Sequence, residues 1–353
     1  MERKSNFELL RIICMILIVW GHLTNKYSIN EPILGFNYIE TNIIKSFSSI
    51  AVNVFILISG YFSISFKPMR LLKICQETWF YSVFLLILTT YMGWHTFILK
   101  KDILYLCPIF SKKYWFITIY VILYLLAPCL NKLASAISKA NFKSILFIGF
   151  VILYLWHTLS FILNSERPID DAGYGIPNFI YLYLLGRYIR LHYNVPIMKQ
   201  NFIFLYFIIS VSLFIFQLIY SLILGFSFTS LYSYNTLFIL GGAISLFLFF
   251  KELNIEYYPF INHWAKYCLA IYIIHMHPLL WDKICVFLQI THISPIWFIP
   301  YSLSISIIMY TTFAIIEKIR LYLFDKVENK INSRIMQTKI AQKIENQIRL
   351  IEV

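Results

Sequence analysis

The sequence predicts an all-α, polytopic membrane protein. Hydrophobic residues make up 59% of the 353 residues and charged residues only 13%, whereas a soluble domain has about 25% charged residues. The apolar residues gather in runs of about 20, the length that a helix needs to cross a bilayer. The runs do not alternate with the period of two that is typical of an outer-membrane barrel. We therefore expect a bundle of about ten transmembrane helices, with both termini in the cytoplasm.

Ten apolar stretches are the expected membrane spans, and together they form a predicted membrane domain over residues 1–317. They are 7–27, 43–63, 77–99, 114–131, 143–163, 176–192, 201–222, 234–250, 265–288 and 296–317. Lys and Arg are more frequent on the side that also holds the N-terminus, which favours a cytoplasmic N-terminus in a plasma-membrane protein. The loop around Lys100 and Lys113 departs from this bias. The net charge of +13 is better explained by lipid headgroups than by nucleic acid.

The first span contains two ionisable residues, Arg11 and His22. On a helix, His22 comes back to within about 20° of Arg11 and lies about 16 Å further along the axis. Glu8, Asn25 and Lys26 lie on the same stripe. A charge at the centre of a membrane helix costs about 2.5–3.5 kcal/mol. We therefore expect this stripe to face a polar interior and to take part in chemistry; the alternative is a buried polar contact that holds the bundle together.

The second span carries small and polar residues at helical spacing, among them Asn53, and it ends in Ser59-Gly60-Tyr61-Phe62. Such a stripe allows helices to approach closely and to hydrogen-bond. By itself the stripe indicates helix packing.

A basic cluster follows the second span and consists of Lys67, Arg70 and Lys73. Glu77 then lies near the start of the third span. Arg and Lys at the cytoplasmic face suit phosphate groups, which they bind through charge-assisted hydrogen bonds. The alternative is a positive-inside marker without a binding role.

Two later spans contain further candidate residues. Trp115 lies at the start of the fourth span, and we expect it to serve either as a platform on which a sugar stacks or as an interfacial anchor. His275 lies in the ninth span just before Pro278, which should loosen the helix there. Asp282 is seven residues beyond His275 and is expected on the same face. His275 and His277 are two positions apart and point apart on a helix, so we expect no metal site.

Residues 318–353 differ in kind, because apolar residues recur there at helical spacing among Lys, Arg, Glu and Gln. This pattern predicts a basic, amphipathic cytoplasmic tail that lies on the membrane or pairs with a partner. A solvated positive-inside anchor is the alternative interpretation.

These segments, taken in order, resemble the acyltransferase-3 family of integral membrane O-acyltransferases, of the bacterial surface-glycan type. The matching segments are Arg11 and His22 with ten residues between them, Phe55–Phe62, Lys67-Pro-Met-Arg70 with Lys73, Tyr114-Trp115-Phe116, and Lys266–His275. The resemblance runs from about residue 5 to residue 317. Two features depart from the family pattern: single Lys and Arg residues replace its double arginine, and Tyr267-Cys268 replaces Tyr-Ser.

The resemblance implies transfer of an acetyl or other short acyl group from acyl-CoA to a hydroxyl of a cell-surface or lipid-linked glycan. His22 is the expected base, because an unperturbed imidazole titrates near neutral pH. Arg11 is expected to steady the thioester, the pantetheine arm or the developing negative charge. The expected ligands of the CoA phosphates are Lys67, Arg70 and Lys73. The expected substrate-binding or supporting residues are Glu8, Asn53, Ser59, Tyr61, Glu77, Trp115 and His275.

Several alternatives stay open. Direct transfer is favoured over a covalent acyl-histidine, although both fit the residues. A transporter or flippase for a glycan precursor would also have ten spans, but it should show inverted repeats, which we do not find. A membrane sensor that uses the tail as its output is a third class. The expected partners are acyl-CoA, a glycan or glycolipid acceptor and membrane lipids, with no tightly bound cofactor; the oligomeric state is open.

Overall fold

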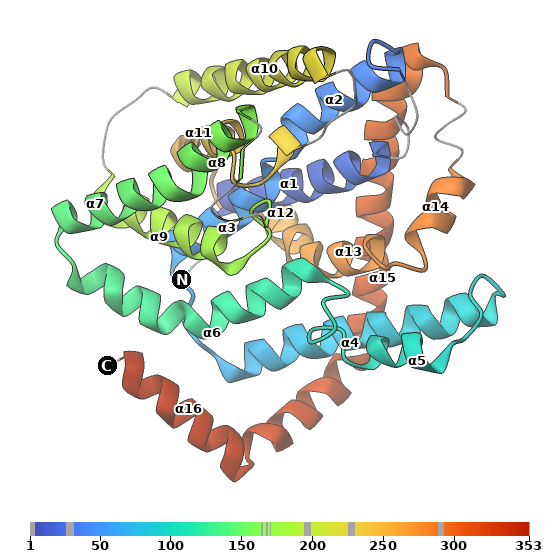
Figure 1. Cartoon of the computed structure of the whole chain (residues 1–353). Helices are drawn as coiled ribbons and strands as arrows, with labels where there is room; N and C mark the ends of the chain where they lie inside the picture. Colours follow the sequence, from blue (N-terminus) through green and yellow to red (C-terminus); the bar gives the residue numbers. More distant parts are fainter. Residues whose placement is uncertain are drawn as a thin grey trace. The chain divides into compact units, whose positions relative to one another are not determined.

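The computed structural model describes residues 4–25, 32–163, 165–166, 169, 171–193, 199–224, 230–288 and 293–352. Within these ranges the regular structure is helical throughout, without a strand (Figure 1). The prediction of an all-α polytopic bundle is confirmed. Lys26 and residue 27, at the end of the first expected span, lie outside the described residues.

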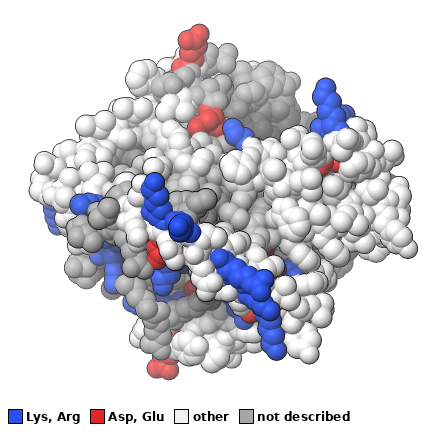
Figure 2. All heavy atoms as spheres, turned by 90° about the horizontal axis from the view of Figure 1, so that it is seen from below, with Lys and Arg blue, Asp and Glu red and all other residues white. Residues whose placement is uncertain are grey.

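Seven helical stretches of the described chain are long and apolar enough to cross a membrane. They are Ser5–Thr24, Phe36–Phe62, Pro68–Tyr91, Trp115–Ala136, Lys139–Ile162, Lys199–Ile223 and Pro295–Met336. Two of the ten expected spans correspond to the shorter helices α9 (Ile176–His192, 17 residues) and α11 (Leu237–Glu252, 16 residues). The number of ten spans therefore stays a prediction. In Figure 2 most of the visible described surface is neither acidic nor basic, as expected for a chain in contact with lipid.

The chain divides into two compact units. The first unit comprises residues 1–62, 137–266 and 289–309, and the second comprises residues 63–136, 267–288 and 310–353. Arg11 and His22 belong to the first unit, whereas the basic cluster of Lys67, Arg70 and Lys73 belongs to the second.

The first unit is built on the helices of the first two expected spans. Its elements are α1 (Ser5–Thr24), α2 (Phe36–Ser48), α3 (Ala51–Phe62), α7 (Lys139–Phe150), α8 (Trp156–Ile162), α9, α10 (Lys199–Leu224), α11 and α12 (Pro259–Trp264), with a π-helical turn (Val151–Leu155) between α7 and α8. α1 packs on α2, α3, α11 and α12, and α10 packs on α2 and α11. The second expected span is divided at Ser49 and Ile50, where α2 ends and α3 begins.

The contact between α3 and α9 is unusually close because both helices present a glycine to the partner backbone. A Cβ on Gly60 would lie 2.1 Å from the carbonyl oxygen of Tyr183, and a Cβ on Gly186 would lie 2.5 Å from that of Leu57. Small residues at this spacing allow two helices to touch along their backbones. The small-residue stripe of the second span therefore serves helix packing, as its pattern indicates.

The second unit contains α4 (Pro68–Tyr91), the short α5 (Leu99–Asp102), α6 (Trp115–Ala136), α13 (Cys268–His275), α14 (Trp281–Phe287), the later part of α15 (Pro295–Met336) and α16 (Lys339–Glu352). Pro68 occupies the first turn of α4, where the missing N–H costs nothing. α13 packs on α4, and α16 packs on α6.

Two stretches differ from the sequence prediction. Instead of one helix over 265–288, α13 ends at His275 and α14 begins at Trp281, because Pro278 cannot continue the hydrogen-bond ladder. His275 and Asp282 consequently do not share a helical face. α15 runs without a break through residues 317 and 318, where the membrane domain was expected to end. The domain boundary itself stays a prediction.

Candidate functional site

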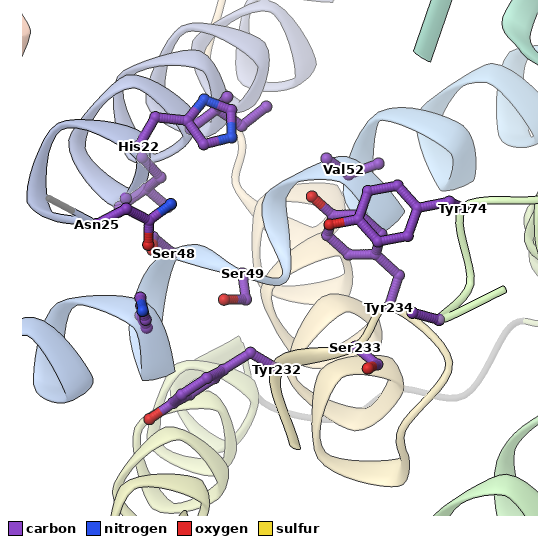
Figure 3. A pocket seen from close by; sticks show the side chains of 14 residues that line it. His22, Asn25, Ser48, Ser49, Val52, Tyr174, Tyr232, Ser233 and Tyr234 are labelled. Atoms are coloured by element: carbon purple, nitrogen blue, oxygen red, sulfur yellow. The ribbon is translucent and has the colours of Figure 1, made fainter. Parts of the chain in front are cut away.

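A cavity of about 340 Å³ opens beside His22 in the first unit. Its wall is formed by the end of α1, by α2 and the start of α3, and by two connecting segments around residues 172–174 and 232–234. The lining residues are Leu17, Ile18, Gly21, His22, Asn25, Lys45, Ser48, Ser49, Val52, Ala172, Tyr174, Tyr232, Ser233 and Tyr234. Figure 3 shows His22 and Asn25 on one side of this cavity and Tyr174 and Tyr234 on another. We call it the His22 cavity.

α1 places His22 in the cavity wall because the helix is packed tightly against α2 just beside it. A Cβ on Gly21 would lie 2.7 Å from Oγ of Ser48, so only glycine fits without moving Ser48. Asn25 follows His22 by three residues and therefore lies on the same face of the helix. The polar stripe predicted for the first span thus opens at this end into a cavity.

α2 contributes further polar groups to the wall of the cavity. Lys45, Ser48 and Ser49 stand at positions i, i+3 and i+4, so they share one face, and all three line the His22 cavity. Together with Asn25 they line the same cavity as His22 and bring an ammonium, an amide and two hydroxyls to it. Each of these groups can donate a hydrogen bond.

Three tyrosines come from the connecting segments. The rings of Tyr174 and Tyr234 lie 4.9 Å apart with planes inclined by 57°. Asn53 donates to the carbonyl oxygen of Tyr234 at 2.7 Å, and the Tyr232 hydroxyl donates to Oδ1 of Asn42 at 2.9 Å. Burial raises the pKa of Tyr174 and that of Tyr232, so both hydroxyls keep their protons at neutral pH. The segment around residues 232–234 is thus anchored to the helices that carry Lys45 and Asn53.

Arg11 lies on the same helix as His22 but is not among the residues of the His22 cavity. Its Nη1 atom lies 3.3 Å from Oε1 of Glu8, and the Glu8 side chain is almost fully buried. At 1.5 Å per residue, about 16 Å of helix separates Arg11 from His22. The two residues therefore occupy different levels of the same helix face.

The other predicted residues of the first unit hold its helices together. Asn53 is fully buried and bonds to the Tyr234 carbonyl. Ser59 donates to the carbonyl oxygen of Phe55 at 3.0 Å. Tyr61 accepts a hydrogen bond of 3.2 Å from Arg190. Of these three, Asn53 is the one that contacts a residue of the His22 cavity.

In the second unit, the predicted basic cluster lies at the start of α4. Lys67, Arg70 and Lys73 are exposed, and Nζ of Lys73 lies 3.7 Å from Oδ1 of Asp325 on α15. The N–H of Lys67 donates to the Tyr124 hydroxyl at 3.0 Å. The cluster therefore stays accessible while its backbone is anchored.

Three further predicted residues also belong to the second unit. Glu77 on α4 interacts electrostatically with Glu317 and Arg320 of α15. Trp115 is half-buried, and its ring makes an edge contact with Phe116 at 5.9 Å. Nδ1 of His275 donates to the carbonyl oxygen of Ile271 at 2.8 Å, and the imidazole is fully buried.

The sequence analysis did not select Lys45, Ser48 or the three tyrosines of the His22 cavity. Lys45 gave a usable signal, because it is a lysine inside an apolar stretch, the same criterion that selected Arg11 and His22. The tyrosines gave no such signal, because they lie in loops of a chain that contains 26 tyrosines.

The comparisons with known proteins give a family. A search of curated proteins and a search of solved structures each found no match. Residues 4–281 match the acyltransferase-3 family, described as an acyltransferase domain. The match covers more than half of the chain and includes every residue of the His22 cavity. This chain therefore belongs to the acyltransferase-3 family and carries a membrane acyltransferase domain.

Proposed function

We propose that this acyltransferase moves an acetyl or other short acyl group from acyl-CoA to a hydroxyl of a cell-surface or lipid-linked glycan, with His22 as the base. The observation that carries the proposal is the His22 cavity, in which a histidine stands among hydrogen-bond donors and two adjacent tyrosine rings. Its volume of about 340 Å³ lies at the small end of the range for ligand pockets. A cavity of this size suits one end of an acceptor rather than a whole glycan.

In this mechanism the neutral imidazole of His22 takes the proton of the acceptor hydroxyl. The oxygen then attacks the carbonyl carbon of the thioester, and the tetrahedral intermediate expels the CoA thiolate, which receives the proton from His22. The products are an ester and CoA. The tyrosine rings of the cavity offer surfaces against which a sugar ring can pack, the role for which the sequence suggested Trp115.

The donor is proposed to use other residues. Lys67, Arg70 and Lys73 supply positive charge for the CoA phosphates, and they are exposed at the beginning of α4. Arg11, about 16 Å along α1 from His22, is suited to the pantetheine arm of a donor that extends along the helix face.

The test is transfer of label in membranes that contain the full chain. Radiolabelled acetyl-CoA is added to membranes with wild type, His22→Gln or Arg11→Ala, and label is measured in the glycan and glycolipid fractions. We expect label with wild type and a loss of at least about 100-fold with His22→Gln, the usual size of a general-base contribution. His263→Gln is the matched control, because His263 is exposed on α12 outside the cavity.

Equal label with wild type and His22→Gln would contradict His22 as the base. If wild-type membranes incorporate label into another hydroxyl compound but not into glycans, the proposal of a glycan acceptor is contradicted. A transporter or flippase, the alternative that the sequence left open, would give no covalent label with any variant.

A further inference from the structure

Lys45 is an ionisable residue inside a membrane-spanning stretch. Neither helix packing nor membrane orientation explains its position. It lies in the last turn of α2 and within the apolar stretch Phe36–Phe62. On insertion scales, a lysine at such a place costs about 2.5–3.5 kcal/mol. A positive-inside role would require a position outside the apolar stretch.

The ammonium of Lys45 makes no hydrogen bond and no ion pair with any residue in the described part of the chain. The described lining of the His22 cavity contains no Asp or Glu that would balance its charge. A lysine offers three donors and no acceptor. The cavity thus presents an uncompensated positive charge, which favours an anion in the cavity.

The packing of α1 against α2 places Lys45 and His22 in the wall of the same cavity. The two helices approach each other closely at Gly21 and Ser48. His22 directly follows Gly21, and Lys45 precedes Ser48 by one helical turn. Both side chains line the same cavity of about 340 Å³. Arg11, by contrast, is not among its lining residues and is paired with Glu8.

We propose that Lys45 is a catalytic residue that stabilises the oxyanion formed when the acceptor oxygen attacks the thioester carbonyl. This inference rests on the proposed function of the His22 cavity. As the new C–O bond forms, the carbonyl electrons move to the oxygen, which lies against the Lys45 ammonium. When the C–S bond breaks, these electrons return to the carbonyl and the thiolate takes the proton from His22. Lys45 keeps its protons throughout.

The physical reason is that charge develops at the carbonyl oxygen only during the reaction. A positioned cation in a site of low dielectric lowers the energy of that state more than the energy of the bound thioester. Asn25, Ser48 and Ser49 can add hydrogen bonds to the same oxygen. In this scheme Arg11 binds the pantetheine arm of the donor and does not act on the oxyanion.

The test compares Lys45→Met, Lys45→Gln and Lys45→Arg in the full chain. The protein is reconstituted with the glycolipid extract of membranes in which wild type gives labelled product, and the concentrations of radiolabelled acetyl-CoA and of extract are varied separately. Rates are expressed per amount of monodisperse protein. Lys143→Met is the matched control, because Lys143 is exposed on α7 and outside the cavity.

We expect Lys45→Met and Lys45→Gln to lower the maximal rate by about 100- to 1,000-fold, the usual effect of removing an oxyanion donor. The KM for acetyl-CoA should stay unchanged, Lys45→Arg should recover part of the rate, and Lys143→Met should resemble wild type. If Lys45→Met does not yield monodisperse protein, the rates of Lys45→Gln and Lys45→Arg are compared instead. A purely structural role for Lys45 predicts that these two variants have equal rates.

Two results would overturn the proposal. An unchanged maximal rate in Lys45→Gln would show that the ammonium does not act in the chemical step. A higher KM for the extract at unchanged maximal rate would show that Lys45 binds a carboxylate or phosphate of the acceptor instead. Failure of the proposed function is distinct, because wild type itself would then give no glycan label.

Discussion

The hydroxyl of Tyr81 donates a hydrogen bond of 2.7 Å to Oε2 of Glu317, although the two residues are 236 positions apart in the chain. Arg320 donates to the same carboxylate through Nε at 2.7 Å and through Nη2 at 2.8 Å. A further bond joins Arg320 to Glu328. Gln76 and Asn332 bond at 2.7 Å further along the same two helices. These contacts fasten α15 to α4 within the second unit.

We expect Arg320→Met to destabilise the protein by about 3–5 kcal/mol, because it leaves the buried Glu317 carboxylate without its cation. The measurement is thermal unfolding of the detergent-solubilised protein. Lys318→Met is the control, because Lys318 is exposed on the same helix. Adding Glu317→Gln to Arg320→Met should recover part of the loss. Equal melting temperatures for Arg320→Met and Lys318→Met would contradict a stabilising role for this cluster.

We expect Gly60→Ala to cost at least about 2 kcal/mol, because the new Cβ would overlap the Tyr183 carbonyl and push α3 away from α9. Gly241→Ala is the matched control: its Cβ would meet only the tip of the Ile209 side chain, at 3.2 Å. The measurement is the yield of monodisperse protein and its melting temperature. If Gly60→Ala behaves like Gly241→Ala, the backbone contact between α3 and α9 is not as close as described.

The pair between Lys73 and Asp325 should affect donor binding more than stability. Both side chains are about half exposed, and such pairs contribute only about 0–1 kcal/mol. If Lys73 binds the CoA phosphates, Asp325→Asn should lower the KM for acetyl-CoA about two- to three-fold by removing a competing negative charge, and added salt should reduce the effect.

Lys73→Gln should raise the same KM, whereas Asp325→Glu, which keeps the charge, should leave it near the wild-type value. The measurement is the initial rate of label transfer at varied acetyl-CoA. An unchanged KM in both Asp325→Asn and Lys73→Gln would place the CoA phosphates elsewhere.

The loop after α4 should lose stability in acid. Burial alone would raise the pKa of Asp102. This effect is more than offset by a hydrogen bond of 2.6 Å from the N–H of Ile98, by the His95 ring at 2.8 Å and by the Lys113 charge. The pKa of Asp102 therefore lies below its ordinary value. The stabilisation is therefore present above the unfolded-state pKa of about 3.9, and it is lost as the pH falls through the folded-state pKa.

Hydrogen exchange measures this effect as the protection of amides in residues 98–106. We expect wild type to be fully protected at about pH 6 and less protected at about pH 3, where the pH has fallen below the unfolded-state pKa. Asp102→Asn should be less protected than wild type at the higher pH and should change little on acidification. Identical protection of wild type and Asp102→Asn at both pH values would show that the carboxylate does not hold this loop.

The sequence by itself determined the fold class, the family and the residue at the centre of the candidate site. Long apolar runs can satisfy their backbone hydrogen bonds in a bilayer only as helices, and the helical period alone put His22 and Asn25 on one face of α1. Periodicity also indicated the stripe in which Gly60 packs against α9. These properties are local, so they can be read within one span.

Only the tertiary structure decided what stands opposite His22. Lys45 reaches the His22 cavity because Gly21 and Ser48 let α1 and α2 touch, and Tyr174 and Tyr234 arrive from loops that are distant in the chain. The tie between Tyr81 and Glu317 has the same origin. Such contacts depend on which separate helices pack against each other, and the spacing of residues within one span does not specify the partner helix.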